Sequence, residues 1–135
     1  MRRSFSLLLF ILAACAADEA PLVATDIVIK APMPGMRISA GYLTLHNNSD
    51  AAITITKISS PQFGAIEMHE TRIEDNVSRM VALAEVTIAA GSAVSLEPGG
   101  KHLMLMRPAD DLDVVTLDFH AGEDVILTLA TKVER

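Results

Sequence analysis

The chain has 135 residues, which is enough for one domain with a hydrophobic core and leaves no room for a second domain. A single cysteine excludes a disulfide within the chain. The net charge of −6 and the scarcity of aromatic residues argue against partners recognised through phosphates or stacked bases. We therefore expect no nucleic acid among the partners.

The N-terminus has the features of a secretory signal peptide. Two arginines precede an apolar run over residues 5–14, and the first acidic residue is Asp18. The run is too short for a membrane-spanning helix, so residues 1–14 are expected to be a cleaved signal of the lipoprotein type. Residues 12–15, Leu-Ala-Ala-Cys, match a lipobox, in which the cysteine is acylated before cleavage makes it the first residue.

Processing at the lipobox predicts a periplasmic lipoprotein held at a membrane through Cys15, because acyl chains bury many methylene groups at about 0.8 kcal/mol each. Residues 15–25 would then be the acylated cysteine and a tether, and residues 26–135 a β domain. The alternative is simple secretion after cleavage behind Ala16 or Ala17, whose small side chains also suit the ordinary signal protease.

Beyond the tether, short runs of alternating apolar residues are separated by turns rich in Gly, Pro, Asn and Asp, and no helical stripe stands out. Strands are predicted at residues 26–30, 39–46, 53–58, 65–72, 79–83, 86–88, 101–106, 114–120 and 125–133. Many short strands at regular spacing are typical of an antiparallel sandwich or barrel. The sequence therefore predicts an all-β domain.

Four residues have the chemistry of a metal site: His69, Met80, His102 and Met104, separated by ten residues, twenty-one residues and one residue. Two imidazoles and two thioethers form a soft, neutral set of ligands. This set suits Cu(I), since thioether sulfur favours polarizable metals, whereas Mg²⁺ and Ca²⁺ prefer carboxylates. The pattern predicts copper as the metal.

Strand alternation separates possible ligands from core residues. Residues two apart on a strand share a face, so His102, Met104 and Met106 should point one way and Leu103 and Leu105 the other. The leucines would anchor the strand to the core and leave the His/Met face available. Met106 is assigned to the core or to a position behind the ligands, because methionine usually fills gaps in packing.

The same reasoning applies to the strand around His69. Met68 should face the core, and His69 the opposite side. A turn at residues 74–76 would fold Met80 back near His69, while a Pro-Gly-Gly turn at residues 98–100 precedes the other two ligands. The four ligands could then meet at one end of a barrel.

Other residues with ligand chemistry receive simpler interpretations. His46 and His120 lie at strand ends and are assigned to the surface. Met33 and Met36 lie in a Pro/Gly loop and could flank a metal site, although packing is the simpler interpretation. The aspartates within residues 110–113 are interpreted as a solvated turn, because no calcium-loop spacing follows them.

The chain resembles a known family, the periplasmic copper chaperones called PCuAC, whose defining pattern is the His-x10-Met-x21-His-x-Met spacing. Three surrounding segments are also similar to the family: Ala-Gly-Tyr-Leu-Thr-Leu-His-Asn at 40–47, Glu-Met-His-Glu at 67–70 and Leu-Glu-Pro-Gly-Gly-Lys-His-Leu-Met-Leu at 96–105. The resemblance extends from about Ile27 to Val133. It implies a cupredoxin-like Greek-key β-barrel with a partly exposed Cu(I) site.

Chemistry and resemblance together predict a Cu(I) metallochaperone that delivers copper by ligand exchange. The expected partner is a copper-accepting protein, such as a cytochrome oxidase subunit or another copper chaperone, and the expected state is a monomer. An enzyme is not expected, because the chain lacks a Ser-His-Asp or Cys-His arrangement. A blue-copper site is disfavoured, since it needs a Cys thiolate.

Two alternatives remain open for the function. One is a copper storage or resistance lipoprotein that has the same site and no dedicated acceptor. The other is an interaction lipoprotein whose His/Met set is fortuitous.

Overall fold

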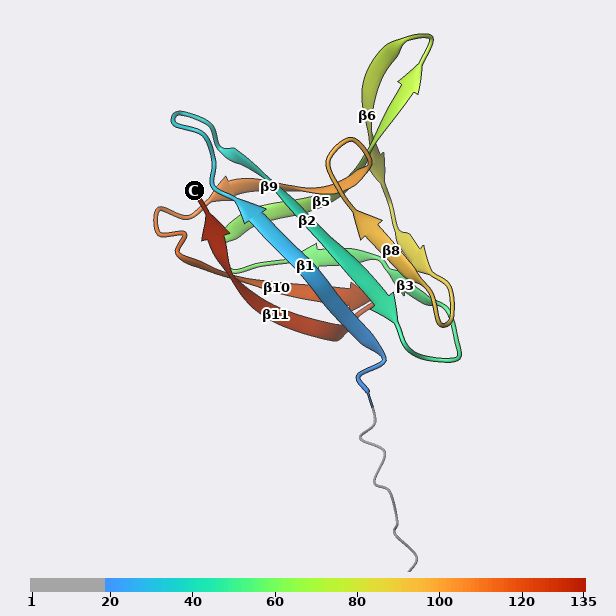
Figure 1. Cartoon of the computed structure of the whole chain (residues 1–135). Helices are drawn as coiled ribbons and strands as arrows, with labels where there is room; N and C mark the ends of the chain where they lie inside the picture. The colour runs from blue at the N-terminus through green and yellow to red at the C-terminus, as the bar shows by residue number, and fades with distance from the viewer. Residues whose placement is uncertain (1–18) are drawn as a thin grey trace, which may run out of the picture.

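The computed structural model describes residues 19–135, so the predicted signal peptide and Cys15 lie outside the described residues. Within that range the fold is all β, as the sequence predicts (Figure 1). The strands are β1 (Leu22–Lys30), β2 (Ile38–Asn47), β3 (Ile53–Ile55), β4 (Lys57–Ser59), β5 (Phe63–Glu74), β6 (Val77–Leu83), β7 (Val86–Ile88), β8 (Ala93–Leu96), β9 (Lys101–Pro108), β10 (Val114–Ala121) and β11 (Asp124–Glu134). Across residues 19–135 there is no helix long and apolar enough to cross a membrane.

Nine strands form one sheet in the order β4-β10-β11-β1-β2-β9-β5-β6, with β8 also paired to β2. Strands β3 and β7 form a separate two-stranded ribbon. The pairs are antiparallel except β1 with β11, which run parallel. Figure 1 shows the sheet bending over on itself, so that its two halves can enclose a core.

The core forms where the inner faces of the two halves meet. One cluster of buried residues contains side chains from strands far apart in the sheet order: Leu43 and Leu45 of β2, Leu103 and Leu105 of β9, and Val115, Leu117 and Phe119 of β10. On each of these strands the buried apolar residues are two apart, as a strand with one face on a core requires. Mostly aliphatic side chains, together with Phe119, therefore fill the space between the two halves.

The first strand begins earlier than predicted. Leu22 is 2% exposed and pairs with Asn47, so the segment from Leu22 to Thr25 belongs to the sheet and not to the tether. A shift of register separates the pairing of Thr25 from that of Val28 and isolates the first half of the strand from the second. This irregularity interrupts the alternation of apolar and polar residues. The sequence pattern therefore did not indicate one long strand.

Two further strand predictions need correction. The predicted strand 53–58 is two strands, because at Thr56 the chain leaves β7 and joins β10, where the Thr56 amide donates to His120 O at 2.9 Å. Strand β8 was not predicted at all. It has four residues, of which only Leu96 is buried, so its own sequence shows no clear strand pattern. Pairing with β2 makes the segment a strand.

Strand β2 positions the site, because two strands share its length. Residues 38–41 of β2 pair with β9, and residues 43–46 pair with β8. Between β8 and β9 the chain bulges out through residues 97–100, where the Gly100 amide donates to Glu97 O at 3.0 Å. The bulge stands beside the start of β9, which carries the second pair of predicted ligands.

Candidate metal centre

Strand register brings the four predicted ligands onto one face of neighbouring strands. His69 of β5 lies directly opposite His102 of β9, and Met104 lies opposite Glu67, two residues from His69. On the other side of β5, Met80 of β6 lies opposite Thr71, again two residues from His69. Since opposite residues and residues two apart share a face, all four side chains leave the same face of the sheet.

That face is the one turned away from the core, as alternation predicts. Leu103, Leu105 and Met68, which point the other way, are all buried in the core cluster. The prediction that Met68, Leu103 and Leu105 face the core is therefore confirmed on both strands. Met106 is half-buried on the ligand face of β9, so it is not a core residue.

His69 is held by a carboxylate from its own strand. Its Nε2 lies 2.8 Å from Glu67 Oε2. Because a carboxylate only accepts hydrogen bonds, Nε2 carries the hydrogen, and in the neutral ring the lone pair lies on Nδ1. That Nδ1 is buried and has no hydrogen-bond partner among residues 19–135. A buried acceptor without a partner costs about 1–3 kcal/mol, which a bound metal ion would offset.

His102 is fixed in the complementary way. The ring is 8% exposed, and its Nδ1 lies 3.1 Å from the Gly100 carbonyl oxygen in the bulge before β9. The carbonyl only accepts, so Nδ1 is the donor and Nε2 keeps the lone pair in the neutral ring. The ring centroids of His69 and His102 are 5.9 Å apart with an angle of 51° between the planes. Two neighbouring imidazole rings thus each keep one lone pair for a ligand.

The thioethers of the set border an open cavity of about 580 Å³. Met80, His102 and Met104 line this cavity, together with parts of the β1–β2 loop, β2 and the bulge before β9. His69, whose ring centroid lies 5.9 Å from that of His102, is not one of the lining residues. Met80 is 62% exposed, so this thioether can move and can be reached from solvent.

The donor chemistry of the cluster favours a soft ion. Within residues 19–135 no group of three or more His, Cys, Asp or Glu side chains is placed to hold a metal. A site for a hard cation built from carboxylates is therefore absent from the described chain. The imidazole and thioether set remains, and it is the set expected for Cu(I).

Ion pairs reinforce the strands beside the cluster. Glu70 of β5 contacts Arg72 at 2.7 Å and Lys101 of β9 at 3.2 Å. Hydrogen bonds from Arg72 and then Lys101 lower the pKa of the Glu70 carboxyl below its ordinary value of 4.5. The Thr71 amide also donates to Gly100 O at 3.0 Å. The carbonyl that orients His102 is therefore tied to β5 as well.

Several other predicted residues have different surroundings. His46 and His120 are half-buried and not fully exposed, because their Nε2 atoms bond to Thr25 Oγ1 at 2.9 Å and to Ser59 Oγ at 2.8 Å. Neither lies on the cavity. Of the aspartates in residues 110–113, Asp113 pairs with Arg135 at 2.7 Å, which agrees with a solvated turn.

Sequence reasoning gave too little weight to four groups at the site. Met33 and Met36 both line the cavity, although packing was the favoured interpretation. Glu67 orients His69, and the shared face of residues two apart was the signal that could have shown it. The Gly100 carbonyl could not have been found in this way, since it acts through the backbone of a bulge.

Comparison with known proteins agrees with this fold. Residues 22–132 match the family described as putative lipoprotein LpqE-like. The copper-bound PCuAC domain from PmoF2 superposes with a TM-score of 0.65 at 18% identity, covering 84% of this chain and 92% of that domain. Cu(I)-bound DR1885 from Deinococcus radiodurans is 28% identical with a TM-score of 0.57, covering 91% of this chain and 83% of that one.

A protein of Rickettsia prowazekii, the uncharacterized protein RP573, is 36% identical over 76 residues. The matched region covers 56% of this chain and 42% of RP573, so the chain spans less than half the length of that relative.

Proposed function

The chain belongs to the LpqE-like family and has the cupredoxin-like fold of PCuAC domains, and on this basis we propose that it binds Cu(I) outside the cytoplasm and passes the ion on as a metallochaperone. The proposed ligands are His69, Met80, His102 and Met104. The copper-bound PCuAC domain and Cu(I)-bound DR1885 support the choice of metal.

The orientation of the two histidines carries the proposal. Hydrogen bonds to Glu67 and Gly100 occupy one nitrogen of each ring and leave the other as a lone pair, and that of His69 is buried without a partner within residues 19–135. A hydrogen bond from a metal-ligating His to a carboxylate or a backbone carbonyl is the usual support for such a ligand. The rings are therefore prepared for a metal before it arrives.

An open, thiol-free site suits transfer in an oxidising compartment. Imidazole and thioether bind Cu(I) without a thiolate, which would be prone to oxidation outside the cytoplasm. Because Met80 is exposed at an open cavity, ligands of an acceptor can approach the ion before all donor ligands leave. Exchange of this kind needs no catalytic group, and we propose that the protein is not an enzyme.

A competition titration tests the site. Cu(I) held by a colorimetric chelator is titrated with the purified domain and with His102→Ala, Met80→Leu and Met106→Leu. We expect stoichiometric removal of copper by the wild type and by Met106→Leu, which loses a thioether on the same strand face that is not among the residues lining the cavity. The variants His102→Ala and Met80→Leu should lose this stoichiometric removal of copper. Equal weak binding by all four proteins would refute the proposal.

The second part of the proposal concerns the protein that receives the copper. We propose delivery to the copper centre of cytochrome c oxidase, with storage or resistance as the competing function. A deletion strain separates the two. Loss of oxidase activity that added copper restores supports delivery, whereas normal oxidase together with copper sensitivity supports storage.

A further inference from the structure

Two methionines outside the proposed ligand set are displayed together by a tight turn. In Met33-Pro34-Gly35-Met36 the Met36 amide donates to Met33 O at 2.8 Å, and Gly35 has a φ of 80°. Pro at the second position and a positive-φ Gly at the third define a type II β-turn, whose first and last Cα atoms lie within about 7 Å. The backbone therefore keeps the starting points of the two side chains close enough for both thioethers to reach one ion.

The turn is anchored at both ends of its loop. On the β1 side, the Ala31 amide donates to Glu134 O at 2.7 Å. On the β2 side, the Arg107 amide of β9 donates to Arg37 O at 3.0 Å. Since these bonds join the loop to strands on either side, its place at the cavity is fixed by the sheet.

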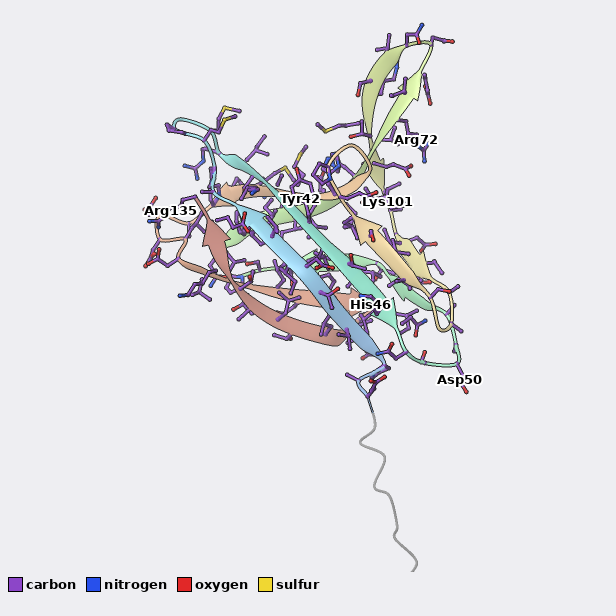
Figure 2. All side chains as sticks on the ribbon, in the orientation of Figure 1. Tyr42, His46, Asp50, Arg72, Lys101 and Arg135 are labelled. Atoms are coloured by element: carbon purple, nitrogen blue, oxygen red, sulfur yellow. The ribbon has the colours of Figure 1, made fainter. Side chains whose placement is uncertain are left out.

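Both methionines line the cavity that Met80, His102 and Met104 also line. Met33 is 70% exposed and Met36 is 52% exposed, so neither fills a gap in the core, which is the usual task of methionine. Figure 2 shows sulfur atoms spread along the side of the molecule that runs from the β1–β2 loop to the base of the β5–β6 hairpin. Four thioethers border one cavity, and the proposed ligand set uses two.

The charge near the turn is compatible with a monovalent cation. Lys30 is the one cationic side chain among the cavity-lining residues, and its Nζ lies 2.6 Å from Glu134 Oε2. This ion pair compensates the positive charge at the cavity wall. Thioethers are neutral and do not titrate, so an ion at the turn would displace no proton.

We propose that Met33 and Met36 form a second, weaker site for a soft monovalent cation at the mouth of the cavity. Two thioethers favour a soft ion such as Cu(I) or Ag(I) and offer little to hard cations. The proposal that an ion binds at Met33 and Met36 depends only on the turn and its place at the cavity. Its role as a station through which copper reaches or leaves the inner ligands rests on the proposed function.

Silver titration followed by methionine methyl NMR tests this site, with Ag(I) as a soft probe that needs no reductant. In the wild-type domain we expect the first equivalent to shift the methyl signals of Met80 and Met104. The second equivalent should shift those of Met33 and Met36. The double variant Met33→Leu/Met36→Leu should lose the second equivalent and keep the first, and Met106→Leu should keep both.

Two outcomes would overturn the second site. One is that the Met33 and Met36 signals stay unmoved after two equivalents, and the other is that they shift with the same midpoint as Met80 and Met104. The variant His102→Ala separates this proposal from the first. In His102→Ala we expect weakened shifts of the inner signals while the turn signals still shift. In the wild type, by contrast, unmoved inner signals together with shifting turn signals would contradict the proposed function alone.

Discussion

At the residue scale, the account depends on which nitrogen of each histidine is free. Glu67 holds Nε2 of His69, and the Gly100 carbonyl holds Nδ1 of His102. The two rings therefore keep different nitrogens for a ligand, Nδ1 of His69 and Nε2 of His102. A ligand pair of this kind is rigid, whereas the exposed Met80 thioether can adjust to the ion.

Removing the carboxylate behind His69 should weaken copper binding without removing a ligand. For Glu67→Ala we expect a loss of about 10- to 100-fold in Cu(I) affinity, the usual cost of deleting a partner of a ligating histidine. Glu74→Ala is the matched control, because it removes the same charge from the exposed end of the same strand. Equal affinities of the two variants would contradict the role of Glu67.

Glu70 gives a pH dependence of stability whose sign follows from its partners. Arg72 and Lys101 lower the pKa of its carboxyl in the folded protein below 4.5. The ionised Glu70 carboxyl therefore stabilises the folded protein above pH 4.5, and this stabilisation is lost as the pH falls through the lowered pKa of the folded state. We expect Glu70→Gln to be less stable than wild type at neutral pH and equally stable in acid, as measured by urea unfolding. A difference that does not change with pH would contradict this.

Much of the residue-level site follows from the sequence, because strand alternation fixes which side chains share a face. It placed Met68 and Leu103 in the core and His102 and Met104 opposite. The contribution of Met33 and Met36 could not be obtained in this way. Alternation describes neighbours on a strand, and these two reach the cavity from a loop far away in the sequence.

At the scale of elements, the paired strands β2 and β9 both contribute residues to the cavity, and Gly41 of β2 allows these strands to pack closely on the core. A Cβ at Gly41 would lie 2.9 Å from Ile29 Cδ1 and 3.1 Å from Leu105 Cδ1. Both neighbours are fully buried, so they have little freedom to move aside.

The Gly41→Ala variant should therefore lose about 1–3 kcal/mol of unfolding free energy, the usual cost of overpacking. Chemical denaturation measures this loss. Gly100→Ala is the control, since its new Cβ would meet nothing closer than Glu97 Cγ at 3.5 Å, and neither glycine has a positive φ. Equal destabilisation by the two substitutions would show that close packing is not the reason for Gly41.

Most strands were predictable because each shows β-branched alternation bounded by turn residues. The strand predictions that failed are those in which the choice of pairing partner determines where a strand begins or ends. The chain between β3 and β4 changes partners at Thr56, and β8 is a strand because β2 has an unpaired half beside it. Such pairings join segments distant in sequence, and a local pattern contains no information about them.

At the scale of the whole molecule, the expected anchor precedes β1 by a short segment. Strand β1 starts at Leu22, seven residues after Cys15. Mass spectrometry of membrane fractions should find Cys15 acylated as the N-terminal residue, and Cys15→Ser should abolish that species. A free N-terminus at Ala17 or Asp18 would show simple secretion instead.

The overall fold was predictable from the family resemblance, and the match over residues 22–132 and the superposition on PCuAC domains confirm it. The shape of the cavity was not predictable. It depends on how the β1–β2 loop, the bulge before β9 and strand β6 approach one another, and these meet only through the long-range register of the folded sheet.

The central claim is that one Cu(I) ion is bound by two imidazoles and two thioethers. X-ray absorption at the copper edge of the protein loaded with one equivalent of Cu(I) measures this donor set directly. We predict a mixed shell of two nitrogen and two sulfur atoms from His69, His102, Met80 and Met104. A shell made only of nitrogen and oxygen, or of sulfur alone, would contradict the account.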